Sequence, residues 1–335
     1  GRFSEIGWSI AGGFLESPVD ESKNIGQVLI LGTSLTTDNP KEEKGRILVF
    51  KIGEGQRLKL ISSNEMKGGV KVVTICDGHV IGCVRGLNVV YKWDYQVEKK
   101  LIKASSNGGH VDGTCMSQMD NILCIGDSLT SVSFSCFDKS SLKISEFARD
   151  FQDNYITTIQ MLDHASVIAA DLTGNLMIYQ VLRDENLNMN AAICEGNIHL
   201  ADQITQILPG DLRAQSAISQ QSYLAVSSTG SIYALHKLDS DLYKKLLRLQ
   251  KNLLGVLKPI GGIKHAEFRK FYNGERSMNA PSGFIDGDLL GRFLGLSLKA
   301  KSDLLGLASK STVAEKIGLS ISEATSIIES LSYGI

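Results

Sequence analysis

The chain alternates short apolar runs with turn-forming residues from about Gly26 to Leu238. Five units each begin with one apolar run, in order QVLILG, HVIGCV, NILCIGD, SVIAAD and SYLAVSS. After a turn each unit continues with a second run, in order GRILVFKI, LNVVYKWD, SVSFSCF, GNLMIYQVL and GSIYALHKL. Runs of this length and composition predict β-strands. We assign LKLISS and GGVKVVTIC to the first unit and LKISEF and ITTIQML to the third as further strands.

Equivalent apolar positions in successive units lie 42 to 57 residues apart. A repeat of about 40–50 residues that holds about four short strands is typical of a β-propeller blade. The pattern therefore predicts a mainly β chain with about five propeller blades. A β-sandwich with irregular loops is the alternative.

Glycines stand between the paired runs, where hairpins need residues with positive φ. Thr173-Gly174-Asn175 and Thr229-Gly230-Ser231 are two such turns, and Gly45 and Gly86 hold comparable places before their second runs. We expect these glycines to form the turns of the blades.

The pattern changes to helical spacing after Leu238. Asp239 or Ser240 can cap a helix over DLYKKLLRLQKNLLGVL, and the Pro-Gly-Gly stretch after Lys258 should end it. Its apolar positions are Leu242, Leu246, Leu249, Leu253 and Val256. We also expect Asp286 to cap GDLLGRFL, and Ser320 with Glu323 to form a capping box. The predicted domains are blades over residues 1–238 and a small α-helical C-terminal domain over residues 239–335.

Composition narrows the class of protein. The 335 residues carry a formal net charge of -1, with 43% hydrophobic and 21% charged residues. These values exclude a disordered chain and give no bulk electrostatic case for nucleic-acid binding. No apolar run reaches the ~18–20 residues that a membrane span requires, so no membrane partner is expected.

Catalytic and metal-binding motifs are absent from the sequence. The six cysteines form no C-x-x-C pair, and the six histidines form no metal-binding motif. We therefore predict no enzyme activity, no cofactor and no metal. Arg149 and Asp150 should form a local salt bridge, and the pair Asp286 and Asp288 should serve a helix terminus.

A basic and aromatic segment follows the first predicted helix. It contains Lys264, Phe268, Arg269, Lys270, Phe271, Tyr272 and Arg276. Because no larger cluster of basic residues surrounds this segment, we favour a role in protein contact or core packing over nucleic-acid binding.

The run EFRKFYNGERSMNAPSGFIDGDLLGRFLGL resembles the C-terminal signature of the large triple-propeller proteins. This family includes the large subunit of UV-damaged DNA-binding protein, a cleavage and polyadenylation specificity factor subunit and a spliceosomal factor. KGRILVF, KGGV and FARDF are similar to segments of the damaged-DNA-binding subunit. The matching positions are Phe268, Arg269, Phe271, Glu275, Arg276, Gly283, Phe284, Ile285, Asp286, Gly287, Asp288 and Leu289. Of these, Phe268, Arg269 and residues 283–289 are expected to be structural.

The resemblance implies that the chain, which starts with Gly1 and not with Met, is a fragment of a longer protein. It would hold about five of seven blades of a third propeller and the helical domain. The implied function is a non-catalytic adaptor of cullin-RING ubiquitin ligases, nuclear and also cytoplasmic, in DNA repair and protein ubiquitination. Substrate receptors would insert a helical segment, the cullin would bind an absent second propeller, and nucleic acid would be contacted through partner subunits. The alternative is an RNA-processing scaffold in polyadenylation or splicing.

The resemblance also implies receptor-facing positions. Tyr155 replaces a family tryptophan, and an apolar family run aligns with Val111, Asp112, Gly113 and Thr114, where this chain is more polar. A second group of receptor-facing positions is Ala225, Ser227 and Thr229.

Overall fold

The computed structural model describes residues 4–16, 25–36, 43–53, 55, 57–95, 99–184, 189–211, 221–274, 277, 281–307 and 317–332. The chain divides into two compact units. The first comprises residues 1–172 and 177–194, and the second comprises residues 173–176 and 195–335.

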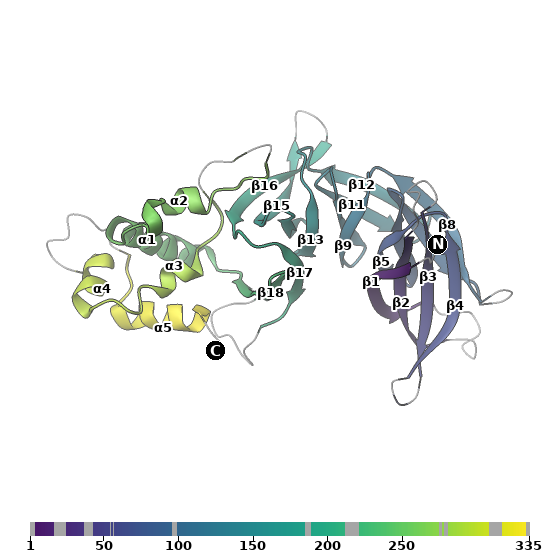
Figure 1. The fold of residues 1–335 in the computed structure, drawn as a ribbon, viewed down its shortest axis with the longest axis horizontal. Helices are drawn as coiled ribbons and strands as arrows, with labels where there is room; N and C mark the ends of the chain where they lie inside the picture. Colours follow the sequence, from purple (N-terminus) through teal and green to yellow (C-terminus); the bar gives the residue numbers. More distant parts are fainter. Residues whose placement is uncertain are drawn as a thin grey trace. The chain divides into compact units, whose positions relative to one another are not determined.

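Consecutive groups of four strands build the sheets of the first unit (Figure 1). The first sheet has the order β1-β2-β3-β4, with β1 (Ser4–Phe14), β2 (Gln27–Thr36), β3 (Lys44–Ile52) and β4 (Leu58–Met66). The second has the order β5-β6-β7-β8, with β5 (Val70–Cys76), β6 (His79–Val84), β7 (Leu87–Trp93) and β8 (Leu101–Gly108).

The third and fourth groups share one eight-stranded sheet. They comprise β9 (Gly113–Met119), β10 (Ile122–Asp127), β11 (Val132–Asp138), β12 (Lys143–Arg149), β13 (Ile156–Met161), β14 (Ser166–Asp171), β15 (Asn175–Asp184) and β16 (Met189–His199). A short parallel pairing of β12 with β16, at Ala148 with Asn190 and Arg149 with Ala191, joins the two groups. The first strands of successive groups touch, since β5 contacts β1 and β9, and β9 contacts β13. Sheets of four strands that meet through their first strands are the blades of a β-propeller.

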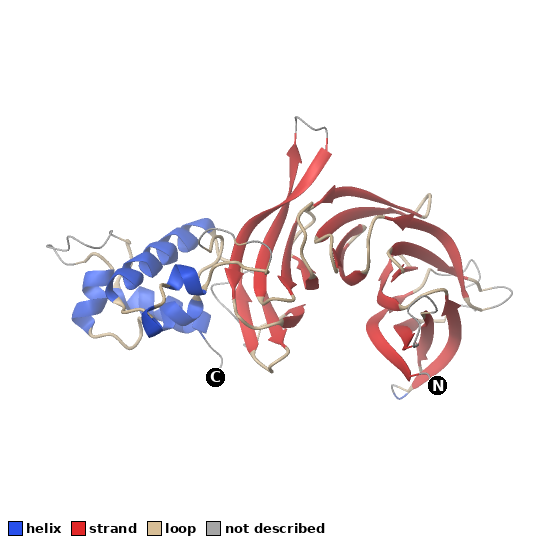
Figure 2. Cartoon of the chain, turned by 45° about the horizontal axis from the view of Figure 1, so that its top comes forward, coloured by secondary structure: helices blue, strands red, loops and turns tan. Residues whose placement is uncertain are grey.

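The second unit holds a three-stranded sheet and the helices. The sheet has the order β17-β18-β19, with β17 (Ile204–Pro209), β18 (Ser222–Ser227) and β19 (Ile232–His236). The helices are α1 (Ser240–Val256), the 3₁₀ turn η4 (Ile260–Gly262), α2 (His265–Phe268), α3 (Gly287–Gly291), α4 (Leu298–Leu304) and α5 (Ile321–Ser332). Figure 2 shows this change from strands to helices along the chain. The fold class is confirmed: β-propeller blades precede a small helical part, whereas a domain boundary at residue 238 stays a prediction.

Two details of the predicted units are wrong. Each predicted first run is the second strand of its sheet, so β5 and β13 belong to the sheets that follow and not to the first and third units. The prediction also missed β1, which pairs with β2 along its length. Glycine dilutes the apolar pattern of β1 (SEIGWSIAGGF), so periodicity alone does not reveal the strand.

The turn predictions are largely confirmed. Gly86, Gly174 and Gly230 have positive φ values of 72°, 90° and 93°. Gly45 differs, because it lies within β3, where a Cβ atom would come 2.3 Å from the carbonyl oxygen of Thr33. Glycine is therefore needed at position 45 because another backbone segment approaches closely, and not because the chain turns there.

Helix ends follow the predicted caps. Asp239 accepts a hydrogen bond from Leu242 N at 2.8 Å, and Asp286 accepts from the amides of Asp288 and Leu289. Leu246, Leu249 and Leu253 of α1 are buried in a core with Leu290 and Phe293. Val256, the last residue of α1, is 57% exposed, so this apolar position of the predicted helix does not join the core.

Candidate partner-binding surface

The predicted contact residues of the first unit lie at one edge of its sheets. Gly113 at the start of β9 pairs with Asp127 at the end of β10, and Ser133 near the start of β11 pairs with Arg149 at the end of β12. Ile156 at the start of β13 likewise pairs with Asp171 at the end of β14. Because neighbouring strands run antiparallel, the connections β8–β9, β10–β11 and β12–β13 and the end of β14 share this edge.

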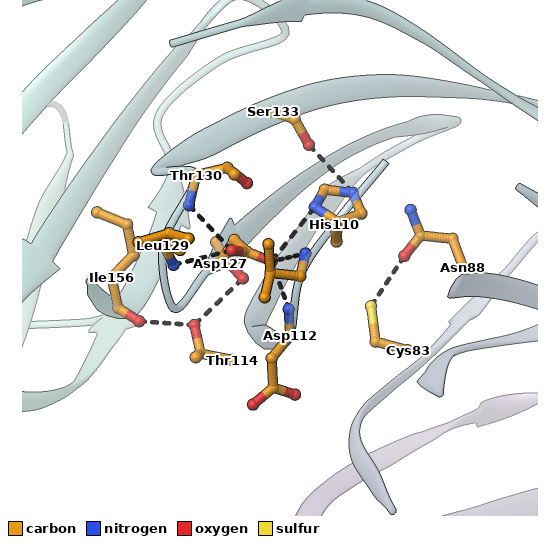
Figure 3. A network of polar contacts seen from close by, with 12 residues as sticks. Cys83, Asn88, His110, Asp112, Thr114, Asp127, Leu129, Thr130, Ser133 and Ile156 are labelled. Carbon is orange, nitrogen blue, oxygen red and sulfur yellow. Dashed lines mark hydrogen bonds and ion pairs between the residues drawn. The ribbon is translucent and has the colours of Figure 1, made fainter. Parts of the chain in front are cut away.

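Asp127 organises two of these connections (Figure 3). Its Oδ2 accepts hydrogen bonds from the amides of Val111 and Asp112 at 2.9 and 2.8 Å. Its Oδ1 accepts from the amides of Leu129 and Thr130 at 2.8 and 2.9 Å. Burial raises the pKa of Asp127, but the hydrogen bonds from Thr130, Leu129 and Asp112 outweigh it, so that this pKa lies below its usual value. The side chain is thus an ionised acceptor for both connections.

Backbone hydrogen bonds continue across the same edge. Ser128 N donates to Asp112 O at 3.0 Å, and Asn154 N donates to Leu129 O at 3.1 Å. Leu172 N donates to Tyr155 O at 3.0 Å. The four chain segments therefore form one connected frame.

Exposed apolar side chains stand on this frame. Val111 is 56% exposed, Leu129 51%, Tyr155 43% and Leu172 48%. Phe151, in the β12–β13 connection, is 73% exposed. We call these five residues the apolar row. Clustered apolar exposure on a hydrogen-bonded frame is typical of protein interaction sites.

The sequence prediction found Val111 and Tyr155 but missed the other three residues of the apolar row. Leu129, Phe151 and Leu172 each stand among polar turn residues, in GDSLTS, RDFQDN and ADLTGN. An apolar residue inside a polar turn gains nothing from a core, so this contrast is the signal that could have identified them.

Gly113 and Thr114 pack and hydrogen-bond beneath the exposed side chains of the frame. Gly113 is buried, and a Cβ atom there would lie 2.8 Å from the sulfur of Cys83. Thr114 Oγ1 donates to Ile156 O at 2.6 Å and can also reach Gly126 O at 3.1 Å. These two residues position the surface, and a direct role in contact stays a prediction.

Charged groups flank the apolar row. Lys71 forms an ion pair with Asp112. Arg149 makes a bidentate contact with Glu146, through Nε at 2.8 Å and Nη2 at 2.6 Å. The predicted local pair of Arg149 with Asp150 is therefore wrong, and Asp150 instead accepts from Ser131 Oγ at 2.8 Å.

The second group of predicted contact residues lies in the second unit. Ala225 is fully buried in β18 and Ser227 is 5% exposed. Thr229 is exposed and donates to Asp202 Oδ2 at 2.7 Å. Only Thr229 of this group presents its side chain at the surface, and its contact with a partner stays a prediction.

The signature segment forms a buried ionic cluster within the second unit. Arg269 Nε donates to Asp286 Oδ2 at 2.7 Å, and His265 Nε2 lies 2.9 Å from the same oxygen. Arg269 also contacts Asp288 Oδ2 at 3.2 Å and the carbonyl of His199 at 3.3 Å. Burial raises the pKa of Asp286, but Arg269 and His265 overcome this and hold it below its usual value. The cluster ties the end of β16 to the start of α3.

Other signature residues fit a structural role. Gly283 has φ of 73°, and a Cβ atom there would come 2.7 Å from Gly196 Cα. Phe268 is 49% exposed and stacks against the Arg269 guanidinium at 4.8 Å. Buried or half-buried side chains are Phe271, Phe284, Ile285 and Leu289, Gly287 begins α3, and Glu275 and Arg276 lie outside the described residues.

Two cations in the described part of the basic segment, Arg269 and Lys270, lie near carboxylates. Arg269 is 8% exposed and held by carboxylates, and Lys270 Nζ lies 4.0 Å from Glu267. Lys264 is exposed. This arrangement favours structural packing over a phosphate-binding surface.

Metal and membrane features are lacking where the chain is described. The six cysteines form no disulfide, and no group of three or more metal-ligating side chains occurs among the described residues. Burial raises the pKa of Cys76 and Cys115 to about 12. No helix in the described ranges has the length and apolar character needed to cross a bilayer.

Comparisons with known proteins place these features in context. A family model described as the CPSF A subunit region matches residues 10–295. DNA damage-binding protein 1 of Solanum lycopersicum is 28% identical over 277 residues, covering 80% of this chain and 25% of the relative. DNA damage-binding protein 1a of Arabidopsis thaliana is 27% identical over 309 residues, covering 90% of this chain and 28% of the relative. The chain thus spans about a quarter of the length of these curated relatives.

Proposed function

The chain belongs to the CPSF A subunit family, and from this membership we propose that it is a non-catalytic scaffold that binds protein partners through the apolar row. The observation that carries the proposal is the exposure of five apolar side chains on one hydrogen-bonded frame. The side chain of Phe151 is 73% exposed, so it adds little to the stability of the fold. Its burial by a partner would be favourable, because apolar surface would be removed from water.

The partner that best fits the apolar row is an amphipathic helix. Such a helix presents apolar residues at intervals of three and four positions, and a row of separate apolar side chains can receive them. Lys71, Asp112, Glu146 and Arg149 beside the row would supply the polar rim that specific interfaces have.

The names of the relatives support a function in the response to DNA damage. We assign this chain the role of an adaptor in a cullin-RING ubiquitin ligase, with substrate receptors at the apolar row and the cullin on a propeller outside these residues. The expected location is the nucleus and also the cytoplasm. Nucleic acid would be contacted through partner subunits.

The family description favours one further candidate function. The family model is described as the CPSF A subunit region. The second candidate function is therefore a scaffold in pre-mRNA cleavage and polyadenylation, or in splicing. Both candidates use a propeller surface for protein contact, and they differ in the identity of the partners.

Affinity purification with quantitative mass spectrometry tests the function. The tagged chain should recover ubiquitin-ligase receptors, and the doubly substituted variant Val111→Asp with Leu129→Asp should recover at least about tenfold less, because charge replaces two exposed apolar contacts. Lys143→Glu, an exposed change on β12, is the control and should recover the same partners as the wild type.

The recovered proteins decide between the two candidates. Polyadenylation or splicing subunits would move the assignment to RNA processing. Equal recovery by the wild type and the doubly substituted variant would exclude the apolar row as the binding surface. Because the ligase assignment places the cullin outside these residues, a cullin is expected only with a longer form of the protein.

A further inference from the structure

A buried carboxylate lies directly beneath the apolar row. Asp127 is fully buried, and its two oxygens accept four backbone hydrogen bonds from the connections that carry Val111 and Leu129 (Figure 3). We propose that Asp127 is the positioning residue of the partner-binding surface and holds these two connections in the conformation that a partner binds. This inference rests on the proposed function and assigns that surface a residue that no partner touches.

The geometry divides the carboxylate between the two connections. Oδ2 accepts from the β8–β9 connection, through Val111 N and Asp112 N, and Oδ1 accepts from the β10–β11 connection, through Leu129 N and Thr130 N. A single side chain therefore joins two connections that are separated in the sequence by the β9–β10 hairpin. Only a carboxylate can do this, since an amide has one acceptor oxygen and places donor hydrogens at the other position.

The surroundings favour an ionised carboxylate. His110 Nδ1 lies 3.9 Å from Asp127 Oδ2, and its imidazole side chain is 2% exposed. Within the described residues this nitrogen has no hydrogen-bond partner. His110 Nε2 lies 3.4 Å from Ser133 Oγ. Arg149, whose guanidinium reaches Thr130 Oγ1 at 3.1 Å, adds positive charge on the side of the β10–β11 connection.

Two other carboxylates near Asp127 are already paired. Asp112 is paired with Lys71, and Glu146 with Arg149. The charge of Asp127 is thus stabilised chiefly by the backbone amides that donate to its two oxygens. Four hydrogen bonds to one ionised group form a rigid support, because each such bond is stronger than a neutral one.

Rigid support matters for binding at exposed loops. Ordering a loop during association lowers affinity, and a loop that is already ordered avoids this loss. Val111 and Leu129 are half exposed and gain little from the core. Their backbone is therefore held by hydrogen bonds, of which Asp127 accepts four.

Asp127→Asn is the direct test, because it changes one oxygen to an amide nitrogen at constant size. We expect amide hydrogen exchange to rise by about tenfold or more for one pair only, either Val111 with Asp112 or Leu129 with Thr130. The amide pair that stays protected shows which of the two positions the remaining oxygen of the substituted side chain occupies. Amides of β10 and β11 should keep their wild-type rates, and unchanged exchange at all four amides would overturn the proposal.

A matched control exists at the opposite edge. Asp138 is exposed and accepts from Ser140 N at 2.9 Å and Ser141 Oγ at 2.6 Å in the β11–β12 turn. Asp138→Asn makes the same chemical change there and should leave both the four amides and partner recovery unaltered.

Partner recovery separates this proposal from the proposed function. Asp127→Asn should reduce recovery of the wild-type partners by about tenfold, although no apolar side chain has changed. Faster exchange with full recovery would overturn the positioning role while the Val111 and Leu129 variant still tests the surface. Full recovery by that surface variant would instead overturn the proposed function.

A second variant keeps the test decisive if Asp127→Asn fails to fold. Asp127→Glu retains the charge and both acceptors but displaces them by one methylene group. It should raise the exchange of both amide pairs and lower recovery. Wild-type exchange and recovery in this variant would contradict the proposal.

Discussion

At the scale of single residues, buried polar side chains and glycines position this surface. Asp127 joins two connections through four amides, and Thr114 joins β9 to β13 through one hydroxyl group. Gly86 allows the β6–β7 turn to approach the carbonyl groups of His110 and Val111. Small local changes at these positions should therefore have large effects.

Gly86→Ala should destabilise the protein strongly. Gly86 has φ of 72°, and a Cβ atom would lie 2.3 Å from His110 O. Backbone strain and overpacking together should lower the free energy of unfolding by about 2–4 kcal/mol in urea titrations. Gly230→Ala is the control, since Gly230 has φ of 93° but no atom within 4 Å of the added Cβ, and it should lose only about 1 kcal/mol. Equal losses would show that contact with His110 is unimportant.

His110 should make stability depend on pH. Burial, with the charge of Arg149, lowers the pKa of His110. Between this lowered pKa and the ordinary value of about 6.5, the unfolded chain binds a proton that the folded chain does not, so the free energy of unfolding should fall as pH decreases below about 6.5. Urea titrations from pH 5 to 8 should show this fall in the wild type and a smaller one in His110→Asn. Parallel curves would contradict the assignment.

At the scale of elements, helix ends and strand edges follow local chemistry. The capping box of α5 is complete, since Ser320 N donates to Glu323 Oε2 at 2.8 Å and Glu323 N donates to Ser320 Oγ at 3.2 Å. The apolar face of α5, with Ala324 and Ile328 buried, then packs into the core that also holds α1. This helix is thus specified twice, by its capping box and by its buried face.

Ser320→Ala should lower the free energy of unfolding by about 1 kcal/mol, because it removes the hydroxyl group that caps α5. Ser326→Ala makes the same chemical change at an exposed position inside the helix. Alanine has the higher helix propensity, so this variant should be equal to or slightly more stable than the wild type. Circular dichroism melts should give shifts of opposite sign, and shifts of the same sign would argue against the cap.

The ionic cluster of Arg269 joins elements of different type within the second unit. Arg269→Met should lower the free energy of unfolding by about 3 kcal/mol or more, since it leaves Asp286 buried without its main cation. Arg292→Met, an exposed change directly after α3, should cost about 0.5 kcal/mol or less. Fluorescence-monitored urea unfolding measures both, and comparable losses would show that the pair with Asp286 adds no stability.

At the scale of the whole molecule, the blades leave one apolar strand face uncovered. The large apolar side chains of β1, at Ile6, Trp8, Ile10 and Phe14, are 45–65% exposed. Gly13 on the same strand instead approaches Ile75 of β5, since a Cβ atom there would lie 3.2 Å from Ile75 Cδ1. Because side chains alternate along a strand, Ile10 and Phe14 lie on the side of β1 turned away from the second sheet, where a further sheet could cover them. Trp8 differs, because its ring lies 5.9 Å from Lys71 Nζ of β5.

The protein should self-associate through this uncovered face. Sedimentation velocity at increasing concentration should show association of the wild-type chain, because exposed apolar patches drive it. Ile10→Lys combined with Phe14→Lys should reduce the association. Ile102→Lys, at a single position of β8 that is 37% exposed, is the control. A monomeric wild type at all concentrations would contradict this prediction.

The sequence by itself determined the features that are written in local patterns. Apolar runs separated by glycine turns gave the strand repeat, and helical spacing with caps gave α1, α3 and α5, because these signals depend on residues close together in the chain. The signature segment around Arg269 and Asp286 likewise indicated the family.

Only the tertiary structure decided which strands share a sheet and which side chains reach the surface. β5 and β13 could be placed only by their register, and Ala225, predicted to face a partner, is buried by neighbours in its sheet. Asp127 gave no signal in the sequence, because its donors lie on two separate connections that meet only after the strands pair. The physical reason is common to all three: burial and hydrogen bonding depend on neighbours in space, whereas sequence patterns record neighbours along the chain.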